Sequence, residues 1–388
     1  MENFPTVLAI CRTAMRSPSQ TLTRNIGKLR DALTEQGNAD QADALSRVLT
    51  AKKATDSLAP TRVVLASADT ERMSRSVQPP VDKESGAPLA TTLFPGEFER
   101  GMEPILDAPL SKAIEALVAE WQSASMLIDA GIRPPLNLLL YGAPGTGKTA
   151  LAKVIADRMG VPLVTARLDG LISSFLGTTA RNIANLFEFA NRYECILLLD
   201  EFDAVAKIRD DPHELGEIKR VVNTLLQCLD DRRDRGFTIA ITNHEHLLDA
   251  AIWRRFDARV AIPRPGIDSR RQMISRFLNG VAAEEVDIDF LAWLTENKTG
   301  AEIETLCNSV KRHLVMNAVG RDSLLEALKV NSLLSADPAD SPRQALFVDG
   351  AEGLARQLST DLEIKFTQES LARLFNTTQS TISRWTRK

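Results

Sequence analysis

Three glycines, a lysine and a threonine stand close together in the segment GAPGTGKT, residues 142–149. The spacing fits G-x-x-x-x-G-K-[ST], in which backbone N–H groups turn toward phosphate oxygens. Lys148 is then expected to reach the β- and γ-phosphates of ATP, and the Thr149 hydroxyl to bind Mg²⁺. An apolar run precedes the motif and a helical pattern follows it, as this chemistry requires. The predicted ATP site consists of Gly142, Ala143, Pro144, Gly145, Thr146, Gly147, Lys148 and Thr149.

Carboxylates end a second apolar run, CILLLDEFD, at residues 195–203. Asp200 is placed to complete the Mg²⁺ shell, and Glu201 to orient or deprotonate an attacking water. Helix capping is the alternative role for Glu201 and Asp203, and we favour it for Asp203.

Polar groups follow two further apolar segments. FTIAITN ends at Asn243, whose amide is a candidate contact for the γ-phosphate or for water, although a polar strand end needs no function. Arg254 and Arg255 end a short helical pattern, LLDAAIWRRFDARV. An arginine that reaches a neighbouring subunit's nucleotide accelerates phosphoryl transfer by about 10³–10⁵. Elsewhere, an exposed arginine pair would simply be a solvated face.

The composition excludes several classes of protein. The chain of 388 residues is 44% hydrophobic and 25% charged, with a net charge of −4, as in a soluble protein of several domains. With this net charge, nucleic-acid binding would need a local patch of positive charge. No apolar run approaches a membrane span and the start lacks a secretory signal, so a cytoplasmic location is expected. The cysteines lack metal-ligand spacing, and we expect reduced thiols at Cys11, Cys195, Cys228 and Cys307.

The distribution of apolar runs, helical patterns and turn residues along the chain predicts its domains. Apolar runs in the centre are nearly continuous and alternate with helical patterns, which is typical of a parallel sheet covered on both faces, the α/β class. Pro- and Gly-rich stretches divide the remainder. The predicted units are an N-terminal helical adaptor (1–60), a linker (61–97), an α/β domain (98–266), a helical segment (267–333), a linker with a helix (334–360) and a terminal helical motif (361–388).

These motifs in this order resemble the AAA family of ATPases: Walker A at 142–149, Walker B at 196–201, sensor 1 at Asn243, and a second region of homology ending in RRFD. The resemblance implies strand order 5-1-4-3-2, a helical lid over 267–333, and a homohexameric ring with ATP between subunits. Arg254 and Arg255 would then act in trans. Most members have LRPGRFD where this chain has IWRRFD, which leaves open which arginine dominates. Ala301 stands where other branches carry a sensor 2 arginine, so no sensor 2 residue is assigned.

The segment LDGLISSFLGTTARNI lies at the family's first pore loop. There the resemblance implies that Phe175, Leu176 and Gly177 face the central channel, where an aromatic ring grips an extended polypeptide and glycine lets the loop move. Anchoring of Phe175 and Leu176 to the core is the alternative. Core segments such as RLDGLISSFLGTTARNIANLF are similar to segments of bacterial AAA ATPases encoded beside subtilisin-like serine proteases. Those two genes form modules associated with plasmid maintenance and phage (antiviral) defence. The sequence contains no protease motif, so proteolysis would require a partner.

The tail, QESLARLFNTTQSTISRW, fits a helix-turn-helix template, with Leu371, Phe375, Ile382 and Trp385 at the apolar positions and Asn376 in the turn. Residues 365–388 contain five basic residues and one acidic residue, which favours DNA contact over a protein-packing role. The candidate DNA contacts are Gln379, Ser380, Thr381, Ser383, Arg384 and Arg387.

Three functions therefore remain open at this stage. The first is a ring ATPase that remodels or unfolds protein substrates, with a partner protease as one variant of this reading. The second is a DNA-targeted ATPase or regulator. The third is a scaffold whose assembly is gated by nucleotide.

Overall fold

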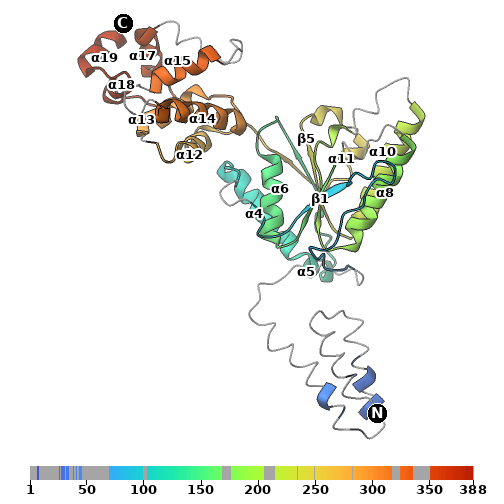
Figure 1. The fold of residues 1–388 in the computed structure, drawn as a ribbon. Coiled ribbons are helices and arrows are strands. Elements are labelled where there is room, and N and C mark those ends of the chain that lie inside the picture. The colour runs from blue at the N-terminus through green and yellow to red at the C-terminus, as the bar shows by residue number, and fades with distance from the viewer. Residues whose placement is uncertain are drawn as a thin grey trace.

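A computed structural model describes residues 70–98, 103–167, 176–204, 215–233, 235–248, 250–281, 283–316, 324–334 and 350–387, and before these only residues 7, 26, 28–30, 32–34, 38, 41 and 43–45. Figure 1 shows two lobes: a sheet covered by helices, and a bundle of helices that includes the C-terminus. No helix among the described residues is long and apolar enough to cross a membrane.

A six-stranded sheet forms the first lobe. Its order is β1 (Ala90–Leu93), β3 (Leu163–Ala166), β4 (Ile196–Leu199), β5 (Phe237–Thr242), β2 (Asn137–Tyr141) and β6 (Ala258–Ala261). All neighbours are parallel except β1, which pairs antiparallel with β3. The five parallel strands have the order 5-1-4-3-2 when they are numbered along the chain, so the predicted order is confirmed and β1 is added to it.

Helices cover both faces of this sheet (Figure 1). Leu138 and Leu140 of β2 pack toward α4 (Ala108–Gln122) and α6 (Lys148–Met159). Leu139 packs on the other face, toward α8 (Leu176–Arg192) and α10 (Leu215–Arg232). Successive residues of a strand point to opposite faces, which explains why a nearly continuous apolar run was needed. The short elements of this lobe are α5 (Ala124–Asp129), η2 (Glu245–Leu247) and α11 (Ala250–Trp253).

The stretch predicted as a linker, residues 61–97, is instead part of the sheet lobe where it is described. β1 lies inside it, and Leu89 and Met73 belong to the core beside α8 and α10. The breakers of this stretch form turns: Val81 and Pro88 make a bridge, and the Asp82 carboxylate accepts hydrogen bonds from the turn between them. The turn residues of this stretch therefore belong to a folded extension of the sheet and not to a linker.

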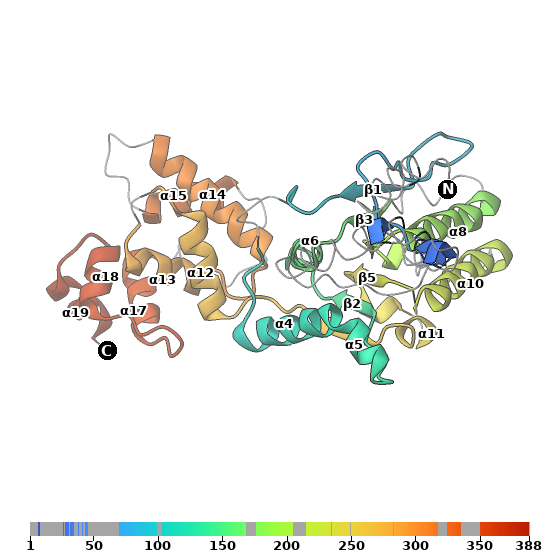
Figure 2. The same ribbon diagram turned by 90° about the horizontal axis from the view of Figure 1, so that it is seen from below.

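The second lobe contains the predicted lid and also the tail (Figure 2). Residues from both share one apolar cluster, which includes Phe290, Leu354, Leu371 and Ile382. The indole N–H of Trp293 donates to the Asp361 carboxylate at 2.8 Å, from the lid to the tail. The helices are α12 (Ile267–Phe277), α13 (Glu285–Leu294), α14 (Gly300–Met316), α15 (Leu324–Leu334), α17 (Gly350–Ser359), α18 (Gln368–Leu374) and α19 (Gln379–Thr386).

Candidate active site

The phosphate loop lies between the end of β2 and the start of α6. Gly142 has φ of 139°, in the region that favours glycine, and a Cβ there would stand 2.3 Å from the carbonyl oxygen of Ile262. Gly147 has φ of 94° and immediately precedes α6, with Pro104 so near that a Cβ at Gly147 would lie 3.2 Å from its Cβ. Only glycine lets the loop pass this close to its neighbours.

Lys148 is buried at the beginning of α6, and its ammonium donates to the carbonyls of Gly142 at 2.8 Å and Ala143 at 2.7 Å. Burial lowers the pKa of Lys148, because it penalises the charged form, while Asp200, and behind it Glu245 and Asp203, oppose that shift. The cation is thus placed within the loop where phosphate oxygens would be expected to sit.

The Thr149 hydroxyl donates to Oδ2 of Asp200 at 2.9 Å. This hydrogen bond joins the loop after β2 to the end of β4, across 51 positions of sequence. A hydroxyl and a carboxylate supply the hard oxygen donors that Mg²⁺ prefers beside phosphates, so the residues present fit an ATP–Mg²⁺ complex.

Glu201 follows Asp200 at the apex of a turn, with an exposed side chain and φ of 51°. A non-glycine residue in this region is strained, which is common at active sites. Its own N–H donates to Oδ1 of Asp200 at 2.9 Å. Asn243 directly follows the neighbouring strand β5, which is parallel to β4, so Glu201 and Asn243 lie at the same edge of the sheet.

Asp203 contacts the end of the neighbouring strand. Its Oδ1 accepts a hydrogen bond from the Thr242 hydroxyl at 3.2 Å and lies 3.4 Å from the Asn243 backbone nitrogen, which donates to it. These contacts join the turn after β4 to the end of β5, and the capping role favoured for Asp203 stays a prediction.

The two adjacent arginines differ in their surroundings. Arg255 is half-buried; its guanidinium donates to the Ala251 carbonyl at 2.7 Å and to Asp230 of α10 at 3.1 Å. Arg254 is exposed, and among the described residues no hydrogen bond or ion pair joins its guanidinium. The pair therefore divides into one arginine held within the subunit and one that is available to another molecule.

The helical lobe contacts the phosphate loop directly, which the sequence reasoning missed. The Ala301 N–H at the start of α14 donates to the Gly145 carbonyl at 3.1 Å. Thr299 and Glu302 hold this helix start in a reciprocal capping arrangement, with bonds of 2.7 and 3.4 Å. Their spacing, T-x-x-E in TGAE, was the available signal. A second contact between the lobes joins the hydroxyl of Ser269 to Asp107 at 2.5 Å.

Other predicted residues lie away from this site or outside the described part. Phe175 lies outside the described residues, and Leu176 and Gly177 begin the backbone of α8. In the tail, Gln379, Ser380, Arg384 and Arg387 are exposed, while Thr381 and Ser383 are half-buried.

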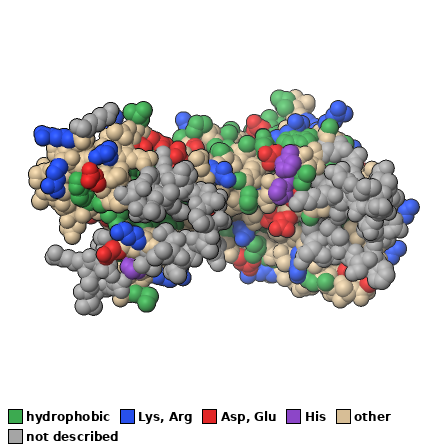
Figure 3. Space-filling model, turned by 90° about the horizontal axis from the view of Figure 1, so that it is seen from above, with side chains coloured by type: hydrophobic (Ala, Val, Ile, Leu, Met, Phe, Trp, Pro, Cys, Tyr) green, Lys and Arg blue, Asp and Glu red, His purple; other side chains and the backbone are tan. Residues whose placement is uncertain are grey.

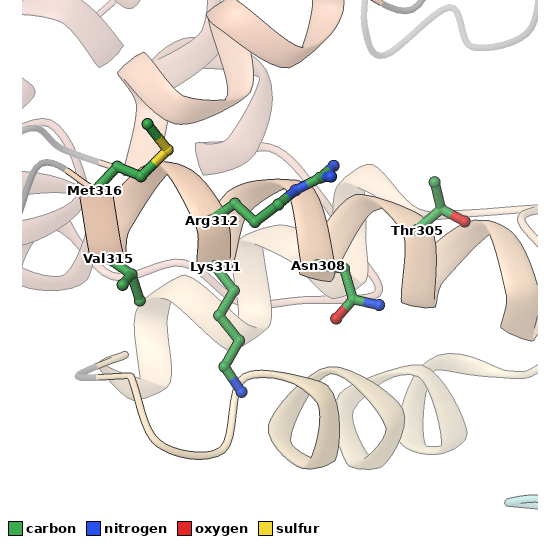
Figure 4. A pocket seen from close by; sticks show the side chains of 6 residues that line it. All are labelled: Thr305, Asn308, Lys311, Arg312, Val315 and Met316. Atoms are coloured by element: carbon green, nitrogen blue, oxygen red, sulfur yellow. The ribbon is translucent and has the colours of Figure 1, made fainter.

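A hollow of about 530 Å³ runs along α14 (Figure 4). The Lys311 ammonium at its edge is engaged with the Asn279 carbonyl at 2.6 Å. No residue that lines the hollow is one of the predicted site residues. The lining residues are Thr305, Asn308, Lys311, Arg312, Val315 and Met316.

The fold and this arrangement define a P-loop ATPase domain. Residues 138–264 match the model of the ATPase family associated with various cellular activities (AAA), so the chain contains an AAA family ATPase domain. The AAA domain of FIGL-1 in complex with ADP superimposes with a TM-score of 0.51 at 21% identity, covering 69% of this chain and 93% of that one. That likeness concerns the fold.

Several curated proteins are similar to part of the chain. An uncharacterized AAA family ATPase of Sinorhizobium fredii is 40% identical over 216 residues, which are 55% of this chain and 64% of that protein. Proteasome-activating nucleotidase 2 of Haloferax volcanii is 36% identical over 211 residues, 52% of this chain and 51% of that protein. The ATP-dependent zinc metalloprotease FtsH of Aquifex aeolicus is 38% identical over 187 residues, 46% of this chain and 30% of that protein. The chain thus spans less than two thirds of each of these relatives.

Proposed function

We propose that this protein hydrolyses ATP within a homohexameric ring and uses the energy to remodel or unfold protein substrates. One observation carries the proposal: the Thr149 hydroxyl and the Asp200 carboxylate meet at 2.9 Å beside the buried ammonium of Lys148. This meeting brings the phosphate loop and the acidic strand end into one site. The FIGL-1 domain of the same fold holds ADP, which supports nucleotide as the ligand.

In this proposal each side chain has a separate task. Lys148 and the loop N–H groups hold the phosphates, and Mg²⁺ supplies charge neutralisation when it is bound to Thr149 and Asp200. Glu201 accepts a proton from the attacking water or orients it, and its exposure leaves it free to do so. The Asn243 amide contacts the γ-phosphate or the same water.

A second subunit completes this site through Arg254. Its guanidinium is exposed and makes no hydrogen bond or ion pair with the described residues, whereas the Arg255 guanidinium donates to Ala251 and Asp230 of its own chain. We therefore assign Arg254 as the arginine that acts in trans, and Arg255 as an internal tie between α11 and α10.

Protein as the substrate is supported by the relatives. One is named as a proteasome-activating nucleotidase and another as an ATP-dependent zinc metalloprotease, and both are more than 30% identical to this chain over about half of its length. Phe175, Leu176 and Gly177 are the proposed pore contacts. Because the sequence contains no protease motif, we further propose a subtilisin-like protease as partner, in plasmid maintenance or antiviral defence, on the resemblance of the core segments.

The experiment uses Glu201→Gln, with Glu188→Gln on the exposed face of α8 as the matched control for a lost carboxylate. Light scattering after size-exclusion chromatography, with ATP and Mg²⁺, should show hexamers for all three proteins. Turnover should fall only in Glu201→Gln, because a water held without a base reacts slowly. Proteins that copurify with this variant identify the substrate. Full turnover by a monomer would contradict the proposal.

DNA targeting is a second candidate function, and the geometry of α18 and α19 favours it. Thr378 caps α19, Asn376 has φ of 49° in the turn, and the exposed positions of α19 carry hydroxyl, amide and guanidinium groups. Figure 3 shows lysine and arginine side chains at the end of the molecule formed by these C-terminal helices. No acidic residue occurs between 370 and 388, so phosphate would meet little repulsion from the tail itself.

Fluorescence anisotropy with a random-sequence 30-base-pair duplex tests this second function. Arg384→Ala should weaken binding and lower the slope of log K against log salt by about one, because one phosphate contact is lost. Arg373→Ala is the matched control, since Arg373 is also exposed but pairs with Glu369 at 2.8 Å. Equal effects of the two substitutions, or no binding by the unchanged protein, would rule out recognition through α19.

A further inference from the structure

The turn after β4 is fastened to the end of β5 at two successive residues. The Phe202 N–H donates to the Ile241 carbonyl at 2.8 Å, and the Asp203 carboxylate lies 3.2 Å from the Thr242 hydroxyl and 3.4 Å from the Asn243 nitrogen. We propose that Asp203 is a positioning residue for ATP hydrolysis, which holds Glu201 and Asn243 in fixed relation to each other. The inference rests on the proposed function.

Burial makes this carboxylate a rigid support. Asp203 is 7% exposed and Thr242 is fully buried, so neither side chain exchanges freely with water. The Thr242 hydroxyl also accepts a hydrogen bond from the His244 N–H at 3.0 Å. The carboxylate, the hydroxyl and the chain on both sides of Asn243 therefore form one connected set, and such sets fix side chains within narrow limits.

The backbone of Glu201 shows why a support is needed. Its φ of 51° is strained for a residue with a side chain, and such a conformation persists only where neighbouring contacts enforce it. The contacts of Phe202 and Asp203 to β5 lie immediately after this residue. If the Asp203 contacts are lost, the turn can relax. The Glu201 carboxylate then no longer keeps its fixed position relative to Asn243.

Two substitutions of Asp203 should reduce turnover to different extents. Asp203→Ala removes both contacts and should lower kcat by about 10²-fold, the loss that removal of a supporting contact or a displacement near 1 Å produces. Asp203→Asn keeps an acceptor oxygen and should recover most of this rate. Neither should weaken ADP affinity by more than about threefold, because the phosphate loop is untouched, and the loss should appear in kcat and not in KM.

A pair of threonines on β5 provides the matched control. Thr242→Val removes the hydroxyl that contacts Asp203 and should lower kcat by about tenfold. Thr238→Val makes the same change on the same strand, at a fully buried hydroxyl that has no hydrogen-bond partner among the described residues, and should leave kcat unchanged. In a double-mutant cycle, Thr242→Val should add little to Asp203→Ala, because both act through one contact.

The outcomes separate this inference from the function on which it rests. Full turnover by Glu201→Gln would overturn the proposed function itself. If Glu201→Gln is inactive but Asp203→Ala and Thr242→Val retain the kcat of the unchanged protein, Asp203 has no positioning role. Equal losses in Thr242→Val and Thr238→Val, or a loss of ADP affinity that parallels the loss of kcat, would also overturn it. Should Asp203→Ala fail to fold, Asp203→Asn and the threonine pair decide the question.

Discussion

Substitution of the adjacent arginines should separate turnover from stability. Arg254 is exposed and its guanidinium makes no hydrogen bond or ion pair with the described residues, so Arg254→Ala should change the free energy of unfolding by less than about 0.5 kcal/mol. If its guanidinium completes a neighbour's site, turnover should fall by about 10³-fold or more.

Arg255→Ala should instead lower the stability of the domain and leave most of the turnover. Its hydrogen bond of 2.7 Å to the Ala251 carbonyl comes from a charged donor and is worth about 1.5–3 kcal/mol at most. The pair with Asp230 is partly exposed, with the two side chains 26% and 48% accessible, so it adds only about 0.2–1 kcal/mol. A total near 2 kcal/mol corresponds to a Tm lowered by roughly 4–8 °C for a domain of this size. Turnover at low temperature should stay within about tenfold of the unchanged protein.

The assays are steady-state phosphate release at 20 °C and thermal unfolding by circular dichroism. A mixing experiment tests action in trans: Arg254→Ala supplies an intact phosphate loop, and Lys148→Ala supplies an intact Arg254. Each is inactive alone, and mixed rings should regain turnover at the interfaces that combine both intact parts. Inactivity of the mixture, with rings still formed, would refute the assignment, as would an inactive but fully stable Arg255→Ala.

Three further outcomes follow from contacts described above. Gly142→Ala should abolish nucleotide binding in a fluorescent ADP titration, because a Cβ 2.3 Å from the Ile262 carbonyl forces the loop to move; unchanged affinity would contradict the described loop. Trp293→Phe should lower the free energy of unfolding of the helical lobe by more than about 1 kcal/mol, seen by urea titration, since it loses the bond to Asp361 and also leaves part of a fully buried ring site empty; Asp361→Asn, which keeps an acceptor, is the control. Burial, with a smaller contribution from Asp231, raises the pKa of Cys228 to about 11, and burial with Glu304 raises that of Cys307 to about 12. Labelling of Cys228 and Cys307 in native protein by a thiol reagent at pH 8, followed by peptide mass spectrometry, should therefore be slow and should accelerate as pH rises and thiolate forms; fast labelling of these two residues at pH 8 would contradict the described burial.

The parallel sheet could be predicted from sequence because its signal is local. A run such as LNLLLY must be buried on both faces, and its order in the sheet follows the family pattern. The site residues at strand ends were predictable for the same reason, since the carboxyl ends of parallel strands meet at one edge.

The features that the sequence could not predict depend on contacts between residues far apart in the chain. Only the fold shows that the Asp203 carboxylate contacts Thr242, 39 positions away. The turns around Gly86 and Pro88 led to the prediction of a linker, because the sequence pattern of this stretch does not show that β1 pairs with β3. The distinction between Arg254 and Arg255 likewise depended on Asp230, which belongs to another helix.

The shared core of the lid and the tail changes how tail variants should be interpreted. Leu371 and Ile382 are fully buried in the cluster that contains Phe290, so removal of residues 361–388 would expose the interior of the lobe that contacts the phosphate loop. Arg270 reinforces this connection, because it is buried beside the Pro265 and Ala292 carbonyls and lies 3.6 Å from Glu363. A truncated protein that loses ATP turnover would therefore say nothing about DNA. Exposed substitutions such as Arg384→Ala leave this core intact, and only they separate recognition by α19 from the integrity of the lid.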